Sequence, residues 1–428
     1  MTKRALLACV LLAAPVLAAT NLIPEGEPVL KDADLQKVGR LFKTCVETMI
    51  AGGRGQVEAE TELLEGIQKW SKKKQLGGKE PLAFPHDIGR AIWFSNEYHK
   101  VKGVKKGKVD MVEFTTNFSD GAEHEFAVRV PSKYNARQAY PLILAIPDAG
   151  EKVDKHISEQ WMDGDLKAGA IVACIPMPED AALWAQIGEQ GNPGGAALTL
   201  TVLGEVTRRY AVDFDNIYLA GRGAGVAAAV ELASLFPDRF AGVIGRTGDP
   251  DETSAENFRG VASYFAGGGS HATAFAEACK ESGADNCTLQ PEGTEADIWA
   301  WMGTNQRNPY PAEAHLLAGS PFPNKAYWVE LPRSDGSVVN RIHAKIDRAT
   351  NTVTVDAEGA RHCFLYFNDD LIDLDQPVKV VINGVEHIDT LPRNLRTLTK
   401  WLYRSGSDPG KVFVASKRYD IPAKEQSE

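Results

Sequence analysis

The segment from Gly221 to Gly225 has the glycine spacing of a nucleophile turn but lacks the nucleophile. It follows an apolar run at residues 217–220 and precedes a run of small apolar residues at 226–230, which predicts a strand, a sharp turn and a helix. In a G-x-S-x-G turn the flanking glycines permit the tight bend and the central residue carries the attacking hydroxyl. The centre here is Gly223, which has no side chain that could attack a carbonyl carbon.

A second candidate pair, Ser270 and His271, follows the apolar run at residues 261–266. A serine and a histidine can act as nucleophile and general base, and ligand sites of α/β sheets lie at the carboxyl ends of strands. Residues adjacent in the chain, however, rarely hydrogen-bond to each other in these roles. We therefore favour the alternative that Ser270 is the N-cap of a helix over residues 272–279.

The sequence gives no indication of a metal or cofactor site. The sequence contains no CxxC motif, and its histidines and cysteines do not have the spacing typical of metal ligands. Five further histidines lie in predicted strands or loops without carboxylates at a motif spacing, and we interpret them as structural residues: His124, His315, His343, His362 and His387.

Cys279 and Cys287 flank a segment, residues 280–286, that reads as a helix end, a turn and a strand start. A disulfide can close a loop of this kind. Disulfides persist in exported proteins, and we therefore predict a bridge between these two cysteines.

Composition and charge exclude several classes of protein. The chain has 428 residues, of which 43% are hydrophobic and 24% charged, as is usual for globular proteins. With 47 basic and 57 acidic residues its net charge is −10, which argues against a nucleic-acid or anionic-membrane partner. No later apolar run reaches the length of about 18 residues that a membrane helix needs.

Residues 1–18 have the layout of a secretory signal. Lys3 and Arg4 precede an apolar stretch at 5–17, and small residues follow it. We expect export to the periplasm or the medium, with no membrane span in the mature chain. A lipoprotein site at Cys9 is an alternative, although only four apolar residues precede this cysteine.

Hydrophobic periodicity divides the remaining chain into three parts. Residues 19–108 predict a helical region that ends in a lysine-rich linker. Residues 109–320 alternate short apolar runs with helical segments, which is typical of a largely parallel α/β sheet. Residues 321–428 predict a β-rich module, in which Asn383 and Gly384 indicate a two-residue hairpin turn.

The part from residue 109 to 320 resembles the α/β-hydrolase superfamily, in particular secreted bacterial relatives of polyhydroxyalkanoate depolymerases, feruloyl esterases and prolyl-oligopeptidase-like proteins. The glycine turn and the segments 140–150, 210–213 and 236–242 carry the resemblance. It implies an α/β-hydrolase-like sheet flanked by helices, here with an N-terminal helical region and a β-rich C-terminal module.

Four positions depart from what this resemblance implies. The nucleophile position holds Gly223, the acid position falls near Ser270, and the histidine position holds Thr294. In the oxyanion segment, Pro147 has no N–H to donate, and the carboxylate of Asp148 would repel a developing oxyanion. Together these departures indicate that Ser–His–acid chemistry is absent.

Two functions remain as hypotheses. The first is an exported pseudo-hydrolase that acts as a binding or scaffold protein. The alternative is an active serine-type hydrolase of ester or peptide bonds whose catalytic residues the sequence does not reveal. The partner would be a small molecule, a peptide or a carbohydrate, and the sequence leaves its identity and the oligomeric state open.

Overall fold

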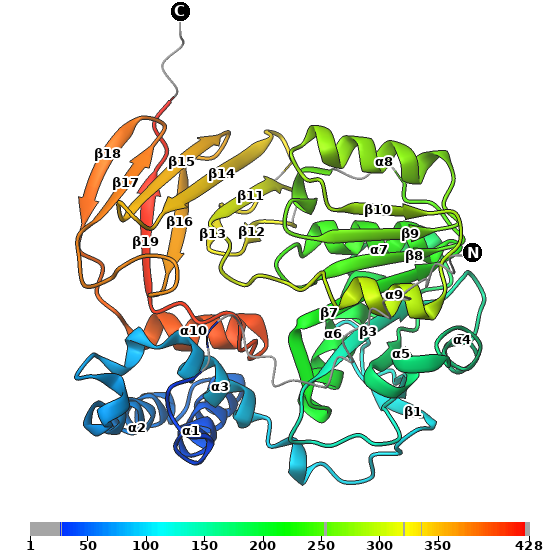
Figure 1. Cartoon of the computed structure of the whole chain (residues 1–428), viewed down its shortest axis with the longest axis horizontal. Coiled ribbons are helices and arrows are strands. Elements are labelled where there is room, and N and C mark those ends of the chain that lie inside the picture. Colours follow the sequence, from blue (N-terminus) through cyan, green and yellow to red (C-terminus); the bar gives the residue numbers. More distant parts are fainter. Residues whose placement is uncertain (1–25, 27, 252–254, 320–321, 335, 424–428) are drawn as a thin grey trace, which may run out of the picture.

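The protein is described here by a computed structural model that covers residue 26 and residues 28–251, 255–319, 322–334 and 336–423 (Figure 1). The predicted secretory signal, residues 1–18, lies outside these described residues. Within them, no helix has both the length and the apolar character needed to cross a membrane.

An eight-stranded sheet forms the middle of the chain (Figure 1). Its strands, in spatial order, are β1 (Val109–Phe114), β2 (His124–Arg129), β4 (Ile171–Cys174), β3 (Tyr140–Ile146), β7 (Val212–Arg222), β8 (Gly242–Arg246), β9 (Ala262–Ala266) and β10 (Cys287–Gln290). β2 pairs antiparallel with both β1 and β4, and all other neighbours are parallel. The carboxyl ends of β3, β7, β8, β9 and β10 therefore meet at one edge of the sheet.

Helices cover both faces of this sheet. One face carries α6 (Gly195–Arg209), α7 (Gly225–Leu235) and α8 (Ser270–Glu281); the other carries α4 (Val153–Gln160), α5 (Gly164–Gly169) and α9 (Glu295–Met302). Along β3, Leu142 and Leu144 belong to the first core and Ile143 and Ala145 to the second, because successive side chains of a strand alternate. The predicted α/β-hydrolase-like sheet flanked by helices is confirmed.

Short elements connect these layers. They are the two-stranded ribbon β5 (Gly188–Glu189) with β6 (Asn192–Pro193), and the 3₁₀ turns η5 (Ala181–Leu183) and η6 (Ala255–Phe258).

The C-terminal part contains two further sheets, as its β-rich pattern predicts. The first has the order β11 (Glu313–Ala318), β14 (Asn340–Asp347), β15 (Thr352–Glu358), β17 (Val378–Ile382) and β18 (Val385–Asp389). The second has the order β12 (Lys325–Ala326), β13 (Val329–Glu330), β16 (His362–Phe367) and β19 (Ala415–Asp420), and α10 (Leu395–Ser405) precedes its last strand. β11 pairs here although it lies before residue 321.

The N-terminal helices pack against this C-terminal part and share one hydrophobic core with it (Figure 1). They are α1 (Asp32–Ile50), α2 (Gln56–Gln68) and α3 (Pro85–Ser95), followed or connected by η1 (Lys69–Lys72), η2 (Lys74–Leu76), η3 (Pro81–Ala83) and η4 (Tyr98–Lys100). Phe42 of α1 and Trp401 of α10 are fully buried members of that core. The two ends of the chain thus build one module, and the hydrolase-like sheet is inserted between them.

A buried arginine links the two modules. Arg307, after α9, donates to the carboxylate of Asp215 in β7 at 2.8 Å. It also donates to both carboxylate oxygens of Asp408, which follows α10, at 2.7 and 2.9 Å. All three residues are buried, so the geometry of this pairing fixes how the C-terminal module sits against the sheet.

Candidate functional site

The turn after β7 has the backbone of a nucleophile turn. Gly223 has a φ of +53°, in the left-handed region, between the end of β7 and the start of α7. A Cβ at Gly221 would lie 2.2 Å from the carbonyl oxygen of Gly225, and a Cβ at Gly225 would lie 2.6 Å from that of Ile146. The two flanking positions therefore admit only glycine, because any side chain would collide with the backbone.

A carboxylate occupies the place where the nucleophile's side chain would be. A Cβ built at Gly223 would lie 2.3–2.4 Å from the carboxyl carbon and both carboxylate oxygens of Asp148. Asp148 is half-buried and is the second residue after β3, the neighbour of β7 in the sheet. The sequence shows that residue 223 has no side chain; the structure adds that its space is filled by another residue.

The same carboxylate also takes up a backbone donor of this turn. Asp148 Oδ1 accepts hydrogen bonds from the N–H of Ala224 at 3.0 Å and from its neighbour Ala149 at 2.9 Å. In hydrolases with this turn, the N–H that follows the nucleophile is one of the donors that stabilise the oxyanion. Here that donor is already paired with a negative charge, which disfavours a second anion at the same place.

A histidine lies close to this turn, but both of its ring nitrogens are in use. His156 Nδ1 contacts Glu151 Oε2 at 2.9 Å, and His156 Nε2 lies 3.2 Å from the indole N–H of Trp161, which can only donate. Nδ1 therefore carries the proton and donates to Glu151. Burial is the main cause that lowers the pKa of His156, which keeps the ring neutral.

Glu151 anchors the loop that carries Asp148. Its Oε2 accepts from the backbone N–H of Asp148 at 3.2 Å and lies 3.7 Å from the guanidinium of Arg222. His156 and Glu151 therefore hold the loop in place, and both ring nitrogens of His156 are engaged.

Ser270 and His271 do not form a nucleophile–base pair. They are the first two residues of α8, both are exposed, and no hydrogen bond joins them among the described residues. The prediction that Ser270 is the N-cap of this helix is wrong, because the N-cap is Gly269. Asp249, after β8, provides the capping instead: its Oδ1 accepts from the N–H groups of Gly269 at 2.7 Å and Ala272 at 3.1 Å.

Thr294, at the expected histidine position, has a structural role. It is the N-cap of α9, and its hydroxyl oxygen accepts from the N–H of Asp297 at 3.2 Å. The carboxylate of Asp297 accepts in return from the N–H of Thr294 at 2.9 Å. This reciprocal capping box explains why a threonine and an aspartate stand at positions 294 and 297 without any catalytic role.

The disulfide predicted between Cys279 and Cys287 is not formed in the structure, where both residues are free thiols. Cys279 is buried near the end of α8, and Cys287 is half-buried at the start of β10. Burial raises their pKa to about 11 and about 12, so both remain protonated and pack as small apolar side chains.

A cavity of about 630 Å³ lies away from the turn, between the hydrolase-like sheet and the C-terminal module. α8, η6 and the strands β11, β14 and β15 provide its walls. Its lining carries both signs of charge and includes Arg259, Arg341, Glu281, His315 and His343. Such a lining fits a polar or ionic ligand rather than an apolar one.

Comparisons with known proteins find similarity in the fold alone. No protein-family model matches the chain, and no curated protein sequence matches it. Among solved structures, the chain is similar to a thermostable esterase, with 17% identity and a TM-score of 0.38 over 46% of this chain and 64% of that one. It is also similar to an S-formylglutathione hydrolase from Agrobacterium tumefaciens, with 14% identity and a TM-score of 0.36 over 47% of this chain and 94% of that one.

A ferulic acid esterase from Anaeromyces mucronatus gives a similar result, with 13% identity and a TM-score of 0.35 over 48% of this chain and 93% of that one. The matched part thus spans less than two thirds of the thermostable esterase and about half of this chain. Because these scores are low, we base the fold on the strand order and on the glycine turn: the chain has an α/β-hydrolase-like fold.

Proposed function

We propose that the protein is an exported member of the hydrolase-fold proteins that has no hydrolase activity and acts by binding. The observation that carries the proposal is the position of Asp148, whose carboxylate lies within 2.4 Å of any Cβ at residue 223 and accepts from the N–H of Ala224. An enzyme of this class needs a nucleophile and a free oxyanion donor at these two places.

The surrounding residues support the same conclusion. Thr294 stands at the expected histidine position and caps α9, and His156 and Asp249 likewise have hydrogen-bonding roles in holding a loop and a helix end. The charged cavity between the two modules offers a separate place for a polar ligand. Export is proposed from residues 1–18 of the sequence.

The test is the reactivity of the purified mature protein towards a fluorophosphonate probe and a short-chain chromogenic ester. We expect labelling and turnover no higher than those of the heat-denatured protein, while a known serine esterase assayed in parallel reacts fully. Stoichiometric labelling of one serine together with ester turnover would establish the alternative, an active hydrolase, and mass spectrometry of the labelled peptide would identify its nucleophile.

A further inference from the structure

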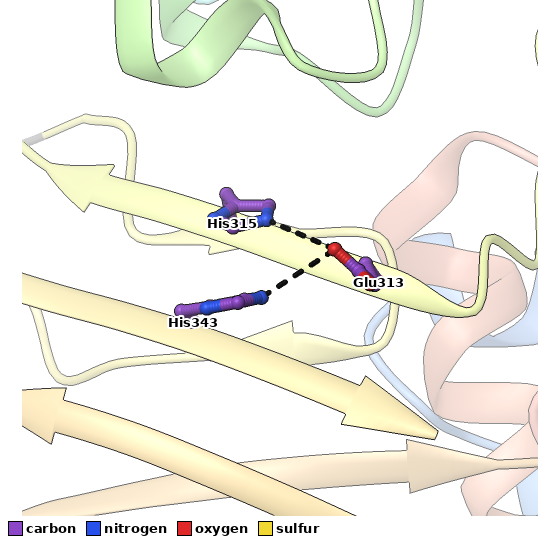
Figure 2. A group of neighbouring side chains, drawn as sticks. All are labelled: Glu313, His315 and His343. Atoms are coloured by element: carbon purple, nitrogen blue, oxygen red, sulfur yellow. Dashed lines mark ion pairs between the residues drawn. The ribbon is translucent and has the colours of Figure 1, made fainter. Parts of the chain in front are cut away.

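Two histidines, His315 and His343, point towards the carboxylate of Glu313 (Figure 2). Both histidines line the cavity between the modules. β11 and β14 pair antiparallel with His315 directly opposite His343. Glu313 lies two residues before His315 and therefore on the same face of β11. The residues between and beside them, such as Ala314 and Ile342, are buried in the core on the opposite face.

The donor atoms of these three side chains are neighbours. Glu313 Oε2 lies 3.6 Å from His343 Nε2 and 3.8 Å from His315 Nε2, and all three donor atoms lie within 4.8 Å of one another. Four ligands around one zinc ion with bonds of about 2.0–2.1 Å are separated by roughly 3.3 Å. The two separations from Glu313 Oε2 exceed this by several tenths of an ångström, and the two imidazole nitrogens lie within 4.8 Å of each other, so the side chains must move closer together to bind one ion.

A neighbouring arginine defines the state of the His315 ring. Arg259 Nη1 lies 2.8 Å from His315 Nε2, and because a guanidinium can only donate, the lone pair of Nε2 accepts this hydrogen bond. Nε2 therefore carries no proton, and an unprotonated imidazole nitrogen is the form that can bind a metal once the guanidinium moves away.

We propose that Glu313, His315 and His343 form a binding site for a divalent transition-metal ion of the zinc class. Two imidazole nitrogens and one carboxylate oxygen are the ligands such ions prefer. Three protein ligands leave a fourth position open, and the cavity of about 630 Å³ provides the space for water or a polar ligand at that position. The proposal is independent of the inactive turn, since the two places share no residue.

Binding of an ion at this cluster requires some of the surrounding side chains to move. Lys345 Nζ contacts Glu313 Oε1 at 2.7 Å, which leaves Oε2 for the ion. Arg259 is exposed and can swing away from Nε2. The rings of His315 and His343 are stacked with centroids 3.9 Å apart, so one ring must turn to aim its lone pair at the ion, and the His343 side chain, 44% exposed, has the freedom to do so.

The experiment is a titration of the metal-free protein with Zn²⁺, by calorimetry and by competition with a chromophoric chelator. We expect one ion per chain, and His343→Ala should weaken binding by more than about tenfold. The matched control is His362→Ala, which removes a half-exposed strand histidine outside the cluster and should leave the affinity unchanged. Circular dichroism of each variant verifies that it folds.

Arg259→Ala gives a second, independent readout. Because the guanidinium occupies the lone pair that the ion needs, its removal should tighten Zn²⁺ binding, a gain that a damaged fold would not produce. The proposal is overturned if the wild-type protein binds no zinc, if His343→Ala binds as well as the wild type, or if Arg259→Ala binds more weakly. None of these results would bear on the ester and fluorophosphonate assays.

Discussion

Asp148 fills the space that a side chain at Gly223 would occupy, and its carboxylate is hydrogen-bonded to the backbone of the next residue. The glycine at the centre of the turn and the aspartate on the neighbouring loop are therefore complementary. Replacing the glycine alone would not restore a nucleophile, since the incoming side chain would meet a carboxylate.

We predict that Gly223→Ser destabilises the protein by roughly 2–4 kcal/mol and creates no esterase activity. A φ of +53° costs an L-residue about 1–2 kcal/mol, and the contact with Asp148 adds the cost of overpacking. Urea denaturation with a parallel ester assay measures both effects.

The contact with Asp148 can be separated from the backbone strain by a double-mutant cycle. Asp148→Ala removes the colliding group, so Gly223→Ser should cost only about 1–2 kcal/mol in that background. If Gly223→Ser lowers the free energy of unfolding equally in both backgrounds, the two residues do not compete for the same space.

Asp249→Ala should destabilise the protein by about 1 kcal/mol, because the N–H groups of Gly269 and Ala272 lose their shared acceptor at the start of α8. Ser270→Ala is the matched control at the same helix end. Its side chain is exposed, and we expect a change within about 0.5 kcal/mol in thermal or chemical unfolding. The opposite ranking would restore Ser270 as the cap.

Arg307→Met should destabilise the protein by about 3–5 kcal/mol, since it leaves the carboxylates of Asp215 and Asp408 buried without their shared partner. Arg418→Met provides the comparison. That arginine pairs with Asp420 at the surface, and its loss should cost no more than about 1 kcal/mol. Similar losses for the two variants, measured by urea denaturation, would contradict a role of Arg307 in joining the modules.

Glu97 should make folding stability dependent on acidic pH. Hydrogen bonds from Lys100 and Lys43 lower the pKa of Glu97 from 4.5 to about 2. A carboxyl whose pKa is lower in the folded state stabilises the fold above the unfolded value, and this contribution is lost as the pH falls from about 4.5 towards 2.

Glu97→Gln should therefore lower the free energy of unfolding by about 1 kcal/mol at neutral pH, a modest value because the side chains of Lys43 and Lys100 are 42% and 62% exposed to solvent. The difference between variant and wild type should shrink as the pH approaches 2. A difference that stays constant across a pH series of urea denaturations would rule out this ion pair as its source.

Local patterns in the sequence were sufficient to predict most of the fold. Apolar runs such as residues 261–266 gave buried strands, and Asn383 with Gly384 gave the turn between β17 and β18, where both residues have positive φ. The shared core of α1–α3 with the C-terminal sheets was not predictable in this way. Packing between the two ends of a chain leaves no local signal.

For the site, the sequence identified an absent side chain at Gly223 but not what replaces it. The sequence indicated that the carboxylate of residue 148 would repel a developing oxyanion. The position of this carboxylate over the turn depends on the conformation of its loop, which Glu151 holds. The cluster of His315 and His343 was missed for a similar reason. These residues are opposite each other only because of the register between β11 and β14, and they were interpreted as structural residues.

The shared core has a consequence for how the protein is made. The helices α1–α3 leave the ribosome first, but the strands and the helix α10 that bury their apolar faces are synthesised last. The module that the two ends of the chain build therefore cannot complete its fold until translation has ended. For the same reason, shortening the chain at either terminus should disrupt the same half of the molecule.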